Sequence, residues 1–161
     1  MSTLDFIFRL SLAMLLGAGI GLERQWRNRN AGLRTNALVA IGAASFLLLS
    51  ESLTNEVGDP SRIAAQIVSG IGFLGAGVIM RDGVNVQGLN TAATLWCSAA
   101  VGTMTGVGLL IEAFLTTFLV VITHFILRPV GNKLQRFANK SSSRQVRPDF
   151  KLSTFKNGES E

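Results

Sequence analysis

Residues 83–127, GVNVQGLNTAATLWCSAAVGTMTGVGLLIEAFLTTFLVVITHFIL, contain a single charged side chain, Glu112, in 45 positions. A transmembrane helix needs about 20 apolar residues, so this stretch is too long for one span and long enough for two. Gly102, Gly106 and Gly108 mark a natural break in the helical pattern. The stretch therefore predicts two membrane-spanning helices, over about residues 90–107 and 109–127.

Three more apolar blocks precede this stretch, at residues 4–22, 33–53 and 61–80. The first rises about 28 Å as a helix, close to the roughly 30 Å thickness of a hydrocarbon core. It does not resemble a signal peptide, because no Lys or Arg comes before it. We therefore predict an all-α polytopic membrane protein, a compact bundle of about five transmembrane helices within residues 1–137.

The placement of charge predicts the orientation of these helices. The connection between the first two blocks carries four arginines: Arg24, Arg27, Arg29 and Arg34. The connection between the second and third blocks carries three acids, Glu51, Glu56 and Asp59, and one base, Arg62. Short basic loops stay in the cytoplasm. The residues from Arg128 onward are also basic, and only an odd number of spans puts both basic regions inside. Five spans, with the N-terminus periplasmic and the C-terminus cytoplasmic, satisfy this condition.

Composition narrows the classes of function. Only 16% of the residues are charged, against about a quarter in soluble domains. One Cys, one His and no Tyr leave little material for a disulfide, a metal cage or a nucleophile–base pair. The pI near 10.4 is compatible with nucleic acid, but the basic residues flank apolar segments, which favours orientation and anionic lipid. We expect no enzyme activity, metal site, cofactor or nucleic-acid partner.

The chain becomes polar after Phe137. We expect residues 138–161 to form a short, basic, mobile cytoplasmic tail, because so few residues cannot build a core of their own. Residues 148–155 alternate weakly, a pattern that suits a single strand on a partner.

Glycine and alanine dominate the apolar segments. Residues 70–75, GIGFLG, fit the G-x-G-x-x-G pattern, but neither a preceding strand nor a nearby ribose-binding acid accompanies them. Small side chains instead let transmembrane helices approach closely and gain van der Waals contact. The pattern therefore predicts a tightly packed bundle without a wide pore.

Arg9 lies inside the first apolar block. Only 13 uncharged residues separate it from Glu23, which is too short a helix to cross the membrane, so Arg9 is expected below the outer interface. Asp5, one turn earlier, is its natural partner. Arg9 either extends to the outer headgroups or forms an intramembrane ion pair or partner contact, and the sequence leaves both open.

Other polar residues lie at the ends of the later blocks. Asp59 is placed to cap a helix that begins at Pro60. The polar residues of the third and fourth blocks either bond to neighbouring helices or line a polar seam; they are Gln66, Asn90, Thr91 and Thr94. His124 is expected at the inner interface.

Several motifs, taken in order, resemble the MgtC/SapB family of bacterial inner-membrane proteins. They are Gly21–Arg24, Ala31–Thr35 leading into Ala37–Val39, Asp59–Gln66 with Gly70–Gly77, and Gly88–Trp96. The resemblance implies about five spans with the N-terminus outside. It also implies roles in magnesium homeostasis, growth at low Mg²⁺, virulence and restraint of the F-type ATP synthase. Family members with a full C-terminal extension carry an ACT-like domain, for which residues 138–161 are too few.

We favour a non-enzymatic regulator of the inner membrane that packs small-residue faces against a membrane protein, the ATP synthase by family analogy. The alternatives are a small Mg²⁺ or proton transporter with a polar seam, and a packing subunit of another complex; self-association also stays open. The candidate functional residues, none of them catalytic or metal-binding, are Arg9, Glu23, Arg24, Arg34, Thr35, Asp59, Arg62, Gln66, Asn90, Thr91 and Thr94.

Overall fold

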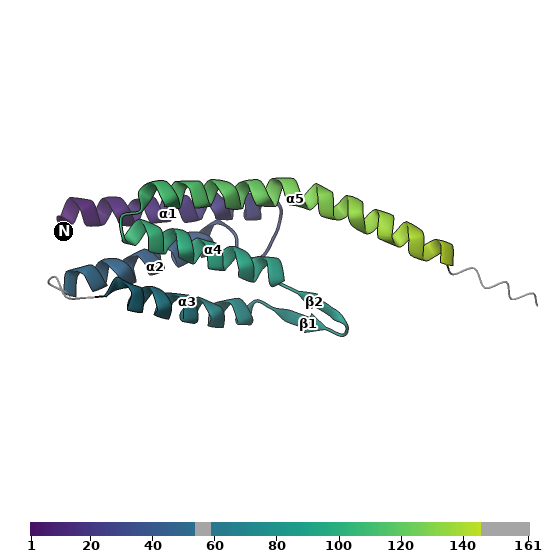
Figure 1. Cartoon of the computed structure of the whole chain (residues 1–161), viewed down its shortest axis with the longest axis horizontal. Coiled ribbons are helices and arrows are strands. Elements are labelled where there is room, and N and C mark those ends of the chain that lie inside the picture. The colour runs from purple at the N-terminus through teal and green to yellow at the C-terminus, as the bar shows by residue number, and fades with distance from the viewer. Residues whose placement is uncertain (54–58, 146–161) are drawn as a thin grey trace, which may run out of the picture. The chain divides into compact units, whose positions relative to one another are not determined.

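The structure, a computed structural model, describes residues 1–53 and 59–145 of the chain. Those residues form five helices and one two-stranded hairpin (Figure 1): α1 (Thr3–Trp26), α2 (Leu33–Leu53), α3 (Pro60–Gly77), β1 (Met80–Asp82), β2 (Asn85–Gln87), α4 (Leu89–Gly106) and α5 (Leu110–Gln145). Since no sheet core occurs within the described ranges, the predicted all-α class is confirmed.

The chain divides into two units, Met1–Phe125 and Ile126–Glu161. In the first unit, α1 to α4 lie alongside one another (Figure 1), and the first turns of α5 join their core. In the second unit, α5 continues as helix through Gln145 with Pro129 inside it. The helix therefore extends past residue 137, where we expected the tail to begin. The strand expected at residues 148–155 lies outside the described residues.

The surfaces of the helices are those of a membrane protein. The helices α1 and α2 and the segment Leu110–Leu127 of α5 are long and apolar enough to cross a membrane. Large apolar side chains such as Leu38, Phe73 and Ile111 are exposed on the helices, as expected where lipid is the solvent. The remaining two helices, α3 and α4, have 18 residues each and are not among those apolar enough to cross a membrane by the same measure. On α4 the polar side chains face inward, because its threonines and Ser98 are largely buried.

A hairpin that we did not expect joins α3 to α4. The helix α3 stops at Gly77, whereas the sequence predicted a span reaching residue 80. Strands β1 and β2 then pair antiparallel around Gly83, whose φ of +60° suits the first central position of a two-residue turn. At Gly88, with a φ of +89°, a side chain would collide with the carbonyl of Val78, so this glycine fixes the base of the hairpin.

Small residues bring α1, α2 and α4 into backbone contact. A Cβ at Gly17 of α1 would lie 2.7 Å from the Cβ of Ala40 on α2, and a Cβ at Gly102 of α4 would collide with the Ala40 carbonyl. Ala40 itself is completely buried. The three helices therefore meet around one alanine, at a distance that only glycine permits on two of them.

This contact predicts a contrast between two glycines. Gly102→Ala should lower the stability of the protein by about 1–3 kcal/mol or more, because the added methyl group forces α4 away from α2. Gly19→Ala, at an α1 position with no atom within 4 Å of the new methyl group, should be neutral or stabilising by up to about 1 kcal/mol. Thermal unfolding in detergent measures both, and equal effects would contradict the packing described.

Candidate functional site

Polar side chains gather at the end of α1 near Glu23, and we call them the Glu23 cluster: Glu23, Arg24, Arg27, Thr91, Thr94 and His124. At its centre the Glu23 carboxylate is only 7% exposed. One of its oxygens lies 2.6 Å from Nε of Arg27, and the other lies 3.1 Å from Nδ1 of His124. Residues about 100 positions apart thus meet at one buried carboxylate.

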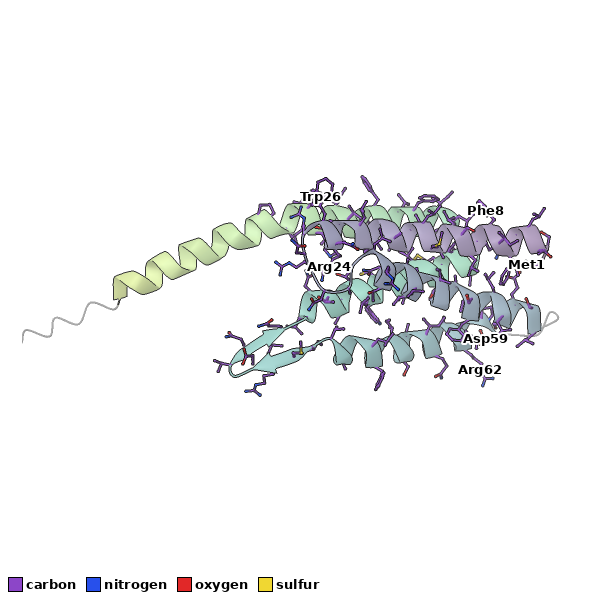
Figure 2. The ribbon with its side chains drawn as sticks, turned by 180° about the vertical axis from the view of Figure 1, so that it is seen from behind. Met1, Phe8, Arg24, Trp26, Asp59 and Arg62 are labelled. Carbon is purple, nitrogen blue, oxygen red and sulfur yellow. The ribbon has the colours of Figure 1, made fainter. Side chains whose placement is uncertain are left out.

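Arg24 is the most buried charge in the cluster, at 3% exposure. Its guanidinium donates to the hydroxyl of Thr91 at 2.6 Å and to the carbonyl of Asn30 at 3.0 Å. Its Nε has no hydrogen-bond partner among the described residues. In Figure 2 Arg24 points between the helices, whereas Trp26 points away from them. The adjacent motif residues Glu23 and Arg24 therefore reach two different helices, α5 and α4.

His124 joins α5 to α4 as well as to Glu23. Its Nε2 lies 3.2 Å from the hydroxyl of Thr94, and Thr94 donates its hydrogen to the carbonyl of Asn90 at 2.7 Å. With that hydrogen used, the Thr94 oxygen accepts from Nε2–H. A second proton on Nδ1 would complete an ion pair with Glu23, so the imidazole is placed between a hydroxyl and a carboxylate.

Beside the cluster, two buried polar residues hold the connection between α1 and α2. Asn36 donates to the carbonyls of Ala31 and Gly32 at 2.7 and 2.9 Å, and its own oxygen accepts from Ser98 at 2.8 Å. Ala31 has a φ of +56°, which is strained for a residue with a side chain. The Asn36 bonds therefore help to hold this strained turn on the bundle.

At the opposite end of α1, the Arg9 side chain is 19% exposed and bonds to three other residues of the bundle. Its guanidinium pairs with Asp5 at 2.9 Å and with Glu51 of α2 at 3.3 Å, and donates to the carbonyl of Gly106 at 3.1 Å. We call these four residues the Arg9 clamp. The predicted Asp5 partner is present, and the clamp joins α1, α2 and the end of α4.

An open groove about 770 Å³ in volume lies between α2 and α3, with Ala99 of α4 also in its lining. Its lining is apolar apart from three of the predicted candidates, Arg34, Thr35 and Gln66. All three are exposed, and their side chains have no hydrogen-bond or ion-pair partner in the part of the chain that the structure describes. They therefore form a different feature from the Glu23 cluster.

The other predicted residues have more local roles. Asp59 caps α3 by accepting from the backbone N–H of Ser61 at 2.9 Å, as expected. Arg62 is exposed and lies with Asp59 at the end of the bundle opposite Arg24 (Figure 2). Asn90 contributes its backbone carbonyl to Thr94, and its side chain is exposed. The supposed seam of Gln66, Asn90, Thr91 and Thr94 is thus not one continuous feature.

Sequence reasoning missed Arg27, His124, Asn36 and Ser98 as members of the polar interior. One signal was available, because Thr91, Thr94, Ser98 and Thr105 recur at helical spacing on the buried face of α4. No comparable signal marks His124. Within residues 1–53 and 59–145, no three His, Cys, Asp or Glu side chains are grouped closely enough to hold a metal ion.

The Glu23 cluster predicts that removing the Glu23 charge destabilises the protein more than removing the same charge at an exposed position. Glu23→Gln should lower stability by about 1.5–3 kcal/mol, because Arg27 and His124 lose a buried charged partner. Glu112→Gln, at an exposed position on α5, removes the same charge and should change stability by less than about 0.5 kcal/mol. Thermal unfolding in detergent compares the two, and matching losses would count against the cluster.

The cap at Asp59 predicts a pH dependence. The hydrogen bonds from Ser61 lower the pKa of the Asp59 carboxyl below its ordinary value. The cap therefore stabilises α3 fully above the unfolded pKa of about 3.9, and this contribution is lost as the pH falls through the lower folded value. Asp59→Ala should destabilise the protein at pH 7, by an amount that shrinks below about pH 4. Asp59→Asn, which keeps an accepting oxygen, should retain most of the stability at pH 7.

Comparison with known proteins indicates one family. A family model described as the MgtC family matches residues 10–133. Protein MgtC of Salmonella choleraesuis (strain SC-B67) is 53% identical over 156 residues, which cover 97% of this chain and 66% of that protein. Protein MgtC of Brucella abortus (strain 2308) is 51% identical over 152 residues, covering 94% and 63%. Protein MgtC of Salmonella typhi is 58% identical over 131 residues, covering 81% and 56%.

The chain thus spans between about half and two thirds of the length of these curated relatives. No solved structure matches it.

Proposed function

Because this chain belongs to the MgtC family, we propose that it is a non-enzymatic regulator in the bacterial inner membrane, linked to magnesium homeostasis and growth at low Mg²⁺. We propose that it acts by packing one helix face against a membrane partner. By family analogy the partner is the F-type ATP synthase, and a link to virulence follows the same analogy. The proposed orientation has the N-terminus periplasmic and the basic Arg24–Arg34 loop cytoplasmic, near anionic lipid.

The observation that carries this proposal is the exposed face of α3. Ala65, Ser69, Gly72 and Ala76 recur at intervals of four, three and four residues, and all four are exposed. Only Ile71 and Gly75 of α3 are buried. Small side chains make few contacts with lipid, but they let another transmembrane helix approach closely. Such close packing is a main source of helix association in membranes.

Transport is supported less well. Polar groups lie at both ends of α1, in the Glu23 cluster and in the Arg9 clamp, as a transport path would need. The section between them is closed, however, by the contact of Gly17 and Gly102 with Ala40. A proton or Mg²⁺ ion would have to pass through touching backbones. Flux of either ion into liposomes that contain only the purified protein would favour transport over regulation.

The regulatory proposal predicts that Gly72→Leu removes function without harming the fold. Gly72 is exposed and no atom lies within 4 Å of a Cβ added there, so the protein should keep its melting temperature. The bulky side chain should hold the partner helix away and weaken association on the order of tenfold or more. Crosslinking to the ATP synthase in native membranes, and ATP-driven proton pumping by vesicles, measure this loss.

Gly19→Leu is the matched control, since Gly19 is also an exposed helical glycine with no atom within 4 Å of an added Cβ. Vesicles with this variant should pump like those with the original protein, and vesicles with Gly72→Leu like those without the protein. If the α3 variant crosslinks and regulates as well as the control, its face is not the contact surface.

A further inference from the structure

We infer that the groove between α2 and α3 is a binding site for one anionic phospholipid, with its phosphate at Arg34 and an acyl chain along the groove. This goes beyond the general attraction of a basic loop to an anionic membrane surface, because it assigns a discrete and saturable site. It also concerns a different face from the exposed residues of α3 in the proposed function.

The lining of the groove suits hydrocarbon. Side chains of Leu38, Val39 and Phe46 form its α2 wall, and Ile67 and Leu74 belong to its α3 wall. At Gly42 and Gly70, which also line it, no atom lies within 4 Å of where a Cβ would stand. The two glycines therefore keep the space between the helices open, and in a membrane an acyl chain is what fills such a space.

One end of the groove carries the groups that bind phosphate. Arg34 and Thr35 lie in the first turn of α2, where the positive end of the helix dipole and free backbone N–H groups favour an anion. Arg34 is exposed, and its guanidinium pairs with no residue in the described ranges. By contrast, Arg9, Arg24 and Arg27 all have partners within the bundle. A guanidinium with unused donors matches the geometry of a phosphate.

The length of the groove favours a lipid over a transmembrane helix. Along α2 it runs from Arg34 to Phe46, a rise of about 18 Å in a helix. One leaflet contributes about half of the roughly 30 Å hydrocarbon core. A single lipid whose headgroup lies at the start of α2 would therefore occupy the groove, whereas a spanning helix would extend well beyond it.

Gln66 is the third polar residue of the lining, and it lies toward the opposite end of the groove. The α3 helix runs back along α2 (Figure 1). Gln66 lies in the first half of α3, whereas Arg34 lies at the start of α2, so the antiparallel course of the two helices separates them along the groove. A phosphate held by Arg34 would be too far away to reach it. Gln66 thus separates recognition by a headgroup at Arg34 from recognition by a polar group deeper in the membrane.

The test compares the full chain, purified in detergent, with added phosphatidylglycerol or phosphatidylcholine. Phosphatidylglycerol should raise the melting temperature in a saturable manner, and native mass spectrometry should show one retained molecule. Arg34→Gln should weaken this binding on the order of tenfold, and Arg34→Lys should weaken it less because the charge remains. Gly42→Leu should abolish it by filling the groove, whereas Gly19→Leu and Gln66→Leu should leave it unchanged.

Equal effects of the two lipids on the original protein would overturn the inference, as would unchanged phosphatidylglycerol binding by Arg34→Gln. Loss of binding in Gln66→Leu would place the polar contact of the ligand deeper in the groove than Arg34 and overturn the assignment of the phosphate, and crosslinks from the groove to a protein would show that a polypeptide occupies it instead. Should Gly42→Leu fail to fold, the pair Arg34→Gln and Arg34→Lys still decides the question. Partner crosslinking through α3 should survive Arg34→Gln, so failure here is distinguishable from failure of the proposed function.

Discussion

The contact of Gly17 and Gly102 with Ala40 is the constraint on which the remaining structure depends. Helices in lipid gain little from burying apolar side chains, because lipid is equally apolar, and they associate by close van der Waals contact. Once α1, α2 and α4 meet at backbone distance, little room is left for side chains between them. The larger polar groups are therefore found at the two ends of the bundle, in the Glu23 cluster and the Arg9 clamp.

The two polar groups at the ends differ in kind. The Arg9 clamp balances one cation with two partly exposed carboxylates, Asp5 and Glu51, and joins α1, α2 and the end of α4. The Glu23 cluster instead holds one carboxylate among two arginines and a histidine, and all of it is largely enclosed. If one charged group of this enclosed cluster is removed, its partners stay buried, and water cannot take the place of the lost group. Glu23 and Arg24 are therefore suited to specifying which helices pack against α1, since they bond to α5 and α4.

Much of this fold was predictable from long apolar blocks, but the partners of its polar residues were not. The helices α1 and α2 and the segment Leu110–Leu127 of α5 follow directly from block length, and the break at Gly108 follows from its glycines, whereas the continuation of α5 to Gln145 was not expected. The hairpin was missed although Asp82-Gly83 is a known turn signal, because strands of three residues are too short to show alternation. Arg24 and Thr91 were both candidates, yet their contact depends on which faces of α1 and α4 meet. Sequence spacing within α4 indicates which of its faces is buried, but not which face of α1 lies against it.

The residues of the Glu23 cluster are synthesised at different times. Glu23 and Arg24 leave the ribosome early, whereas Thr91 and His124 follow later. At roughly 5–20 residues per second, the interval between Glu23 and His124 is on the order of 5–20 seconds. For that period the first helix must keep its charges at the aqueous edge of the membrane. The last helix to insert is therefore the one that supplies the second side chain in contact with the Glu23 carboxylate.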